Sequence, residues 1–211
     1  MKIIDLSHEL HEEMPVFPGT EKPIFKRANT IEADGFAEHI MNMYSHTGTH
    51  IDAPSHMLKE GENLDDMDVS NFVGRAIIID VKGLSKIDID ILKPYEYKIK
   101  NAEFVILNTG HSKFWGHEEY FGGFPALTID SAKWLCEMNL KGIGIDAISI
   151  DYMENPSFDV HHILMNKGLL IIENLTNLDE VGEDEFVLSV LPLKTKEADG
   201  SPIRAVAIKN I

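Results

Sequence analysis

The stretch GIGIDAISIDYMENPSFDVHHILMNKGLLIIENL, residues 142–175, decides the fold. Residues 142–151 are largely apolar and rich in isoleucine, a pattern that predicts a buried strand. Residues 159–168 predict a short helix that stops at Gly168, and residues 169–175 predict a second strand. A strand, a helix and a strand in direct succession are typical of an α/β protein.

The same alternation continues on both sides of this stretch. Further strands are predicted at 74–83, 103–110, 185–194 and 202–209, a helix with Thr128 as its N-cap at 128–141, and a helix or turn-rich connection at 87–100. Upstream, residues 25–31 and 36–46 flank an Asp34-Gly35 turn signal and predict a hairpin. We therefore expect a single α/β domain with a mixed β-sheet over residues 1–211, in which the proline-punctuated residues 1–25 form an extended arm.

Composition excludes several classes of protein. The 211 residues are 44% hydrophobic and 26% charged, as in a globular protein with a core. Lys plus Arg number 19 against 35 Asp plus Glu, and the formal net charge of −16 argues against nucleic acid or an anionic membrane as a partner. No apolar run approaches the roughly 18 residues of a membrane span. The single cysteine, Cys136, forms no internal disulfide, so a reducing cytoplasm is the expected compartment.

Residues 45–56, SHTGTHIDAPSH, place three of the ten histidines of the chain close to an aspartate. In extended backbone His50 and Asp52 point to the same side, and Gly48 permits a reversal that brings His46 toward them. Two imidazoles and a carboxylate suit zinc or manganese. The alternative is a solvated polar loop, because surface loops with two histidines are common.

A second group of polar residues lies far along the chain. Glu173 ends an otherwise apolar strand, where a carboxylate buried without a partner would be costly. The helix just before that strand carries His161 and His162, so one imidazole is expected to face the end of the strand. The alternatives are that Glu173 lies in water beyond the sheet and that the histidine which does not ligate is exposed.

Taken together, these residues resemble a known family. HTGTHIDAPSH is similar to the HxGTHxDxPxH signature of the cyclase, or bacterial kynurenine formamidase, family of metal-dependent hydrolases. Other blocks fit in order along nearly the whole chain: PVFPG, VILNTGH, GIGIDAISID, HHILMNKGLLIIENL and LPLKTKEADGSPIRAVAI. The resemblance implies a swivelling β/β/α fold, a homodimer and two divalent metal ions per chain, zinc first and manganese as the alternative.

The family's functional positions fall on residues of this chain. The implied metal ligands are His46 and His50 on the first ion, Asp52 shared by both ions, and His161 and Glu173. His56 corresponds to the family's proton donor and acceptor, with a third ligand position on the first ion as the alternative. Phe17 stands where the formamidases carry a tryptophan that contacts the aromatic substrate, so Phe17 is expected to contact the substrate here.

The implied activity is hydrolysis of a small-molecule amide. The prototype is the conversion of N-formyl-L-kynurenine to L-kynurenine and formate in tryptophan catabolism. In this scheme a metal-activated water attacks the amide carbonyl, and His56 delivers a proton to the leaving nitrogen. The alternatives are hydrolysis of another amide or of a lactam such as isatin, and a metal-binding scaffold without catalysis.

Other polar and aromatic residues carry weaker expectations. Asp146 and Asp151 flank a predicted strand, either as carboxylates that orient a ligand imidazole or as residues in solvent, which is favoured for Asp151. His111 follows a strand end and is a candidate pocket residue. The remaining residues are expected on the surface or in packing, with a pocket role open for the last two: His8, His11, His39, His117, Phe114 and Trp115.

Overall fold

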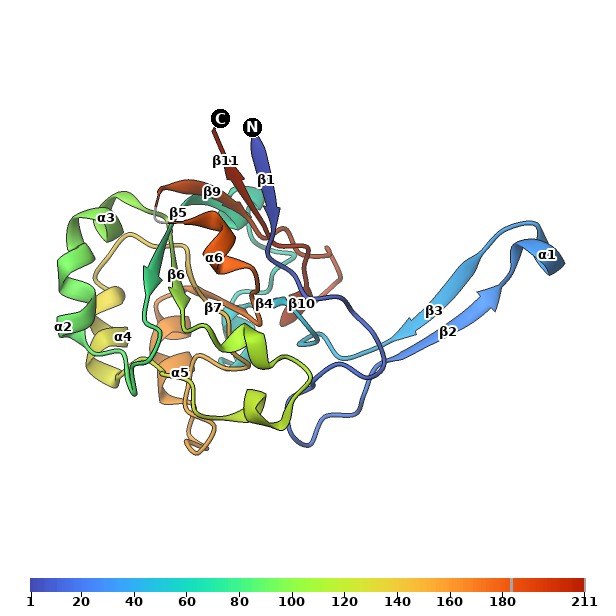
Figure 1. Cartoon of the computed structure of the whole chain (residues 1–211), viewed down its shortest axis with the longest axis horizontal. Coiled ribbons are helices and arrows are strands. Elements are labelled where there is room, and N and C mark those ends of the chain that lie inside the picture. The colour runs from blue at the N-terminus through green and yellow to red at the C-terminus, as the bar shows by residue number, and fades with distance from the viewer. Residues whose placement is uncertain (183, 211) are drawn as a thin grey trace.

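A curled, mixed sheet of nine strands organises the chain (Figure 1). The computed structural model describes residues 1–182 and 184–210. In sheet order the strands are β1 (Lys2–Asp5), β11 (Val206–Lys209), β9 (Phe186–Ser189), β5 (Val73–Asp80), β6 (Phe104–Asn108), β7 (Gly142–Ile145), β8 (Leu170–Glu173), β4 (His50–Asp52) and β10 (Gly200–Pro202). Strands β5 to β8 are parallel, and the strands on either side of them pair antiparallel. The predicted α/β class with a mixed sheet is confirmed.

Apolar side chains cover both faces of the central strands. In β6, Val105 and Leu107 join one buried cluster, whereas Phe104 and Ile106 join the other. Successive residues of a strand point to opposite faces, so a strand buried on both faces must be apolar throughout. This burial explains why the central strands could be recognised as continuous apolar runs.

Short helices pack on the two faces of the sheet. One face is covered by α2 (Ile89–Leu92), α3 (Glu96–Asn101), α4 (Ile129–Leu135) and α5 (Asp159–Asn166), which lie together in Figure 1. The last helix, α6 (Leu178–Val181), contributes Leu178 and Val181 to the cluster on the other face. Thr128 caps α4 by accepting from the backbone of Ser131, as predicted. No helix within residues 1–182 and 184–210 has the length and apolar character needed to cross a bilayer.

Several predicted elements are shorter in the structure, among them the strands expected at 185–194 and 202–209, of which Phe186–Ser189 and Val206–Lys209 form β9 and β11. The strand expected at 142–151 ends at Ile145, because the chain then leaves the sheet and Ile150 donates its backbone N–H to Glu173 over 2.9 Å. The helix expected at 128–141 ends at Leu135. Residues 136–141 must turn back toward the sheet, where Lys141 donates to the carbonyl of Glu103.

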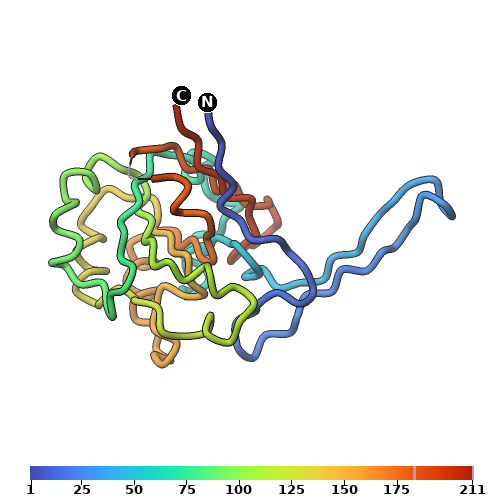
Figure 2. The backbone as a smooth tube through the Cα atoms, viewed as in Figure 1, coloured from blue at the N-terminus to red at the C-terminus, as the bar shows by residue number. Residues whose placement is uncertain are grey.

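The predicted hairpin is present and stands away from the body of the molecule (Figures 1 and 2). It consists of β2 (Ile24–Asn29), the short helix α1 (Ile31–Asp34) and β3 (Glu38–Asn42). Gly35, with φ of 81°, makes the turn that the Asp-Gly pair predicted. Strand β3 leads directly into residues 45–49 and then into β4, so the hairpin is connected to the histidine cluster by a few residues of chain.

Candidate metal centre

Strand β4 lies at the centre of the candidate site, between β8 and β10. His50 and Asp52 point to the same side, as their spacing predicted, and His50 Nε2 lies 3.1 Å from Asp52 Oδ1. In the pairing of β4 with β8, His50 stands opposite Glu173, whose Oε2 is 3.6 Å from His50 Nε2. The strand register therefore brings Glu173 to the histidine cluster across 123 residues of sequence (50 to 173).

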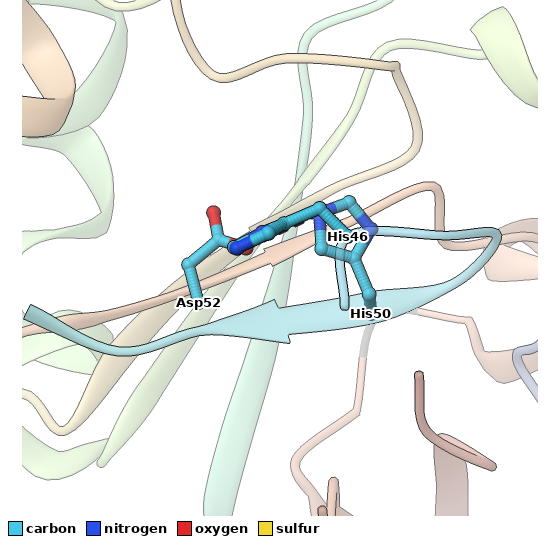
Figure 3. Close-up of side chains that lie close together, drawn as sticks. All are labelled: His46, His50 and Asp52. Carbon is cyan, nitrogen blue, oxygen red and sulfur yellow. Dashed lines mark hydrogen bonds and ion pairs between the residues drawn. The ribbon is translucent and has the colours of Figure 1, made fainter. Parts of the chain in front are cut away.

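His46 reaches the same place through a turn at Gly48. Gly48 has φ of 64°, a left-handed conformation that favours glycine, and a Cβ added there would also displace the end of the Leu10 side chain. His46 Nδ1 lies 2.7 Å from Asp52 Oδ1, and the ring centroids of His46 and His50 are 5.3 Å apart. Figure 3 shows the side chains of His46, His50 and Asp52 gathered at one point.

The distant helix supplies a third imidazole. His161 on α5 places Nε2 3.4 Å from Glu173 Oε1 and 3.9 Å from Asp52 Oδ2. His161 and Glu173 are buried, whereas His162 is exposed, as expected for the histidine that does not ligate. The alternative position of Glu173 in water beyond the sheet is wrong.

Asp151 orients His161. Its Oδ2 lies 2.7 Å from His161 Nδ1, and its carboxylate also accepts from the backbone N–H groups of Val160 and His161. Asp151 is buried, so the favoured expectation of a solvent position is wrong. A carboxylate on the far nitrogen of an imidazole fixes the ring and leaves the other nitrogen free to bind a cation.

The donor set suits divalent cations. Three groups of side chains could hold a metal ion. Two share Asp52, namely His46, His50 and Asp52, and Asp52, His161 and Glu173; the third is His46, His56 and Asp199. Asp52 is 1% exposed, and within the described residues neither Asp52 nor Glu173 forms an ion pair with a lysine or an arginine. Buried carboxylates and imidazoles that converge without a lysine or arginine partner are a donor set that divalent cations prefer, so the residues fit bound metal ions.

The charged and buried surroundings of the centre shift the pKa values of its side chains. Burial alone would lower the pKa of His50, but the charge of Asp52 and its hydrogen bond outweigh burial and raise it to about 9. Burial would also lower the pKa of His161, but its hydrogen bonds to Asp151 and Glu173 outweigh burial and raise the pKa to about 10. Burial would raise the pKa of Asp52, yet the imidazoles of His50 and His46 hold it well below its usual range.

His56 lies beside this group without joining the pairs around Asp52. It ends the short 3-10 helix Pro54–His56, and its ring stacks on His46 with 3.8 Å between centroids. Burial lowers the pKa of His56 to about 4, so its imidazole is neutral at pH 7. The ring lies at the edge of the site, where an imidazole can exchange a proton with a bound substrate.

A cavity of about 330 Å³ opens onto the candidate metal ligands and His56. Its polar floor is formed by the candidate ligands and His56, and aromatic side chains stand in its wall: Phe17, Tyr44 and Phe158. The centroids of Phe17 and Phe158 are 6.3 Å apart. The site therefore combines a floor of candidate metal ligands with aromatic side chains suited to a flat, apolar group.

Comparison with known proteins agrees with this arrangement. A family described as "Putative cyclase" matches residues 4–152. The chain belongs to the cyclase family. A relative named "Kynurenine formamidase", from Bacillus thuringiensis (strain Al Hakam), is 35% identical over 206 residues, which cover 96% of this chain and 95% of the relative.

Solved structures of other proteins share this fold. Isatin hydrolase A from Labrenzia aggregata, bound to benzyl benzoate, superposes with a TM-score of 0.89 at 26% identity and covers 99% of this chain and 94% of that chain. A structure described as a potential metal-dependent hydrolase with cyclase activity has a TM-score of 0.81 at 29% identity, covering 98% of this chain and 96% of that chain. Both the family resemblance and the fold class that it implied are confirmed.

Some residues considered from the sequence lie away from the cavity of this cyclase-family chain. His111 is buried against Phe114, Tyr120 and Phe124, and the described cavity wall includes neither His111 nor Trp115. Trp115 stacks on His8 at 3.9 Å between centroids. These side chains therefore have packing roles. A packing role was expected for His8, whereas His111 was considered as a pocket residue.

Asp146 is buried but does not face a candidate ligand. It accepts from Thr109 N over 2.7 Å and from His111 N over 3.0 Å, and so fixes the loop after β6. Both expectations for Asp146 are therefore wrong, because it neither lies in solvent nor orients a ligand imidazole. The exposed histidines His11, His39 and His117 lie on the surface, as expected.

Sequence reasoning missed three residues that contact the centre. Asn174 donates from Nδ2 to the carbonyl of Gly48, the same carbonyl that lies 2.8 Å from His50 Nδ1. Asp199 and Gly200 come from the C-terminal part of the chain and contact His46. Asn174 is adjacent to Glu173 and could have been suspected for that reason, but the position of Asp199 depends on a strand pairing that no local pattern reveals.

Proposed function

We propose that this chain is a metal-dependent hydrolase of carbon–nitrogen bonds that removes the formyl group from an N-formyl aryl amine, with N-formyl-L-kynurenine as the expected substrate. The observation that carries this proposal is the cavity in which imidazoles and carboxylates form the floor and aromatic side chains form the wall. The relative named kynurenine formamidase, which is similar over nearly the whole chain, supports the same reaction.

The proposed centre holds two ions, most naturally Zn²⁺, with Mn²⁺ also compatible with nitrogen and oxygen ligands. One ion would be held by His46, His50 and Asp52, and the other by Asp52, His161 and Glu173. When bound, such ions act as Lewis acids that polarise the amide carbonyl and make water nucleophilic near neutral pH.

The residues of the chain perform the remaining tasks. Neutral His56 takes up a proton and delivers it to the amide nitrogen as the C–N bond breaks, so that water is added across that bond and formate and the amine leave. Asp151 holds His161 in place. Phe17 and Phe158 hold the aryl ring and exclude water from the reacting atoms.

A lactam is the second candidate substrate, because the isatin hydrolase is the structural relative with a TM-score of 0.89. Steady-state kinetics of the zinc-loaded chain with N-formyl-L-kynurenine and with isatin separates the two. We expect kcat/KM for the formamide to exceed that for isatin by at least roughly tenfold, the effect of about 1.4 kcal/mol in transition-state binding. The reverse order would assign a lactam hydrolase, and no turnover of either substrate by the zinc-loaded chain would favour a scaffold.

Cation binding is expected to release protons. With pKa values of about 9 and about 10, His50 and His161 are protonated at pH 7 in the metal-free chain, whereas a ligand imidazole must be neutral. Titration of the metal-free chain with Zn²⁺ at pH 7 should therefore release at least about two protons per chain, and more where His46, whose pKa is lowered by burial but raised overall by Asp52, is protonated. Calorimetry in two buffers that bind Zn²⁺ only weakly and differ in ionisation enthalpy, Pipes and Hepes, measures this number.

The raised pKa values also fix the direction of the pH dependence. Zinc affinity should increase as the pH rises toward 9, and the stabilisation of the metal-free fold by these imidazolium groups, complete below pH 6.5, should disappear as the pH passes the raised values. The exposed neighbour offers a matched control, and His162→Ala should release the same number of protons as the wild type. Equal heats in the two buffers would contradict the proposed ligands.

We also propose that two copies of the chain associate through the hairpin formed by β2, α1 and β3. All residues of β3 are exposed, including Ile40 and Met41, and an isolated two-stranded ribbon is at best marginally stable in water. Exposed apolar groups on such a projection indicate a surface that is covered by another protein. A second copy fits the homodimer that the family resemblance implies.

Light scattering coupled to size exclusion tests the association. The wild type should have twice the mass of one chain, and Ile40→Glu should shift the population to a single chain because a carboxylate is costly at a buried apolar contact. Tyr97→Glu, at a more exposed apolar position on α3, is the control and should leave the dimer intact. A wild type with the mass of one chain would contradict the proposed association.

A further inference from the structure

The C-terminal part of the chain forms a wall of the metal centre. Strand β10 pairs with β4 so that Gly200 stands opposite Asp52, and Ala53 donates its backbone N–H to the carbonyl of Asp199 over 2.9 Å. This pairing fixes the backbone of Asp199 and Gly200 beside His46. It places the carboxylate of Asp199 next to the centre, outside the two ligand groups around Asp52 and in a third group with His46 and His56.

Gly200 fits closely against the ring of His46. A Cβ at position 200 would lie 2.4 Å from His46 Cε1 and 2.7 Å from His46 Nε2. The same ring stacks on His56. The position of the His46 ring is therefore set by its contacts with the backbone of β10 and with the imidazole of His56.

The side chain of Asp199 lies beside both rings. Its Oδ2 is 3.3 Å from His46 Nε2 and 3.9 Å from His56 Nδ1. The other nitrogen of His46, Nδ1, faces Asp52 at 2.7 Å. Asp199 is thus the polar partner of His46 on the side away from the shared carboxylate.

The other two candidate ligand imidazoles also have a polar partner on the ring nitrogen that points away from Asp52 and Glu173. His50 Nδ1 lies 2.8 Å from the carbonyl of Gly48, and His161 Nδ1 lies 2.7 Å from Asp151 Oδ2. Partners of this kind fix the tautomer and the orientation of a metal-binding imidazole. With Asp199 assigned to His46, each of the three rings has one.

We propose that Asp199 is a positioning residue. Its carboxylate contacts Nε2 of His46 and so holds this ring in place for the first ion, and it also orients His56 for proton transfer. Gly200 provides the space for the His46 ring. This inference rests on the metal centre of the proposed function. The carboxylate accepts the proton of His46 Nε2 and leaves Nδ1 turned toward Asp52. Because the carboxylate attracts the Nδ1 side of His56, Nε2 of that ring stays available to protonate the amide nitrogen of the substrate.

The side chain of Asp199 can be tested separately from the fold. The side chain is 47% exposed, and the strand pairing uses only the backbone carbonyl of the residue. Shortening the side chain therefore keeps the pairing of β10 with β4. Glu197, two residues earlier, is an exposed carboxylate whose ion pair is with Lys196, and it serves as a matched control of equal charge.

The experiment is calorimetric titration of the metal-free chain with Zn²⁺, followed by kinetics of the zinc-loaded chain. Asp199→Ala should weaken one of the two zinc-binding steps by about 10- to 100-fold and leave the other unchanged, the usual effect of removing a partner of a ligand imidazole. Asp199→Asn, which keeps an acceptor oxygen, should fall between the wild type and Asp199→Ala. Turnover should decrease through kcat with little change in KM, and Glu197→Gln should match the wild type in every measurement.

The outcomes separate this inference from the proposed function. If the wild type binds two zinc ions and Asp199→Ala binds both with affinities and kcat within twofold of the wild type, Asp199 has no positioning role. If the wild type itself binds no zinc, the metal centre is wrong and the proposed function fails with it. Gly200→Ala, checked for folding by circular dichroism, should also weaken only one zinc-binding step, and unchanged binding in the folded variant would contradict the close fit against His46.

Discussion

Replacement of His56 by alanine is expected to lower kcat for N-formyl-L-kynurenine by roughly 10³-fold, within the usual range for loss of a general acid–base group. The zinc content should stay at the wild-type value. His56 stacks on His46 but is not among the groups that surround Asp52. Without its imidazole the leaving nitrogen receives no proton, and an unprotonated amine is a poor leaving group.

Metal analysis and kinetics of the same preparation provide the measurement. Free imidazole added to His56→Ala should restore part of the activity, because it can enter the space left by the side chain and carry the proton. His117→Ala, which removes an exposed histidine outside the described cavity lining, is the control and should behave as the wild type. Loss of one zinc ion from His56→Ala would show instead that His56 is a ligand of the first ion.

The largest effect is expected for Asp52→Asn. Asp52 is the member common to both ligand groups, with Oδ1 facing His46 and His50 and Oδ2 facing His161. An amide has no negative charge to share between two cations, so both zinc-binding steps should weaken together. We expect kcat to fall on the order of 10⁴-fold, because Lewis acidity contributes several kcal/mol and each ~1.4 kcal/mol is a factor of ten.

Calorimetry and metal analysis distinguish this effect from a general loss of negative charge. Asp90→Asn, at an exposed position in the first turn of α2, removes the same charge from the surface and should leave binding and turnover unchanged. Thermal unfolding of the metal-free variants confirms that Asp52→Asn remains folded. Binding of two zinc ions to Asp52→Asn with wild-type affinity would refute the shared position of this carboxylate.

Local pattern predicted the features that depend on local physics. The central strands are buried on both faces, and they were therefore visible as apolar runs. The two-residue spacing of His50 and Asp52 placed both side chains on one side of a strand, and Gly48 allowed the reversal that brings His46 to them. The position of Glu173 at the end of an apolar strand was informative because an unpartnered buried carboxylate is costly.

Features that depend on distant pairing were not predictable in this way. Asp151 was expected in solvent, because nothing in residues 142–151 shows that the chain leaves the sheet after Ile145 and returns the carboxylate to His161. Asp199 reaches the centre only through the pairing of β10 with β4, which joins residues far apart in the sequence. The strand register that sets Glu173 opposite His50 is likewise a property of the assembled sheet.

The most direct measurement is anomalous diffraction at the zinc edge from crystals grown with Zn²⁺. Two peaks are predicted in each chain, one at about 2.0–2.2 Å from the facing atoms of His46, His50 and Asp52 and one at the same range from Asp52, His161 and Glu173. A map with no peak between these side chains, or with Glu173 turned away from His161, would contradict the account.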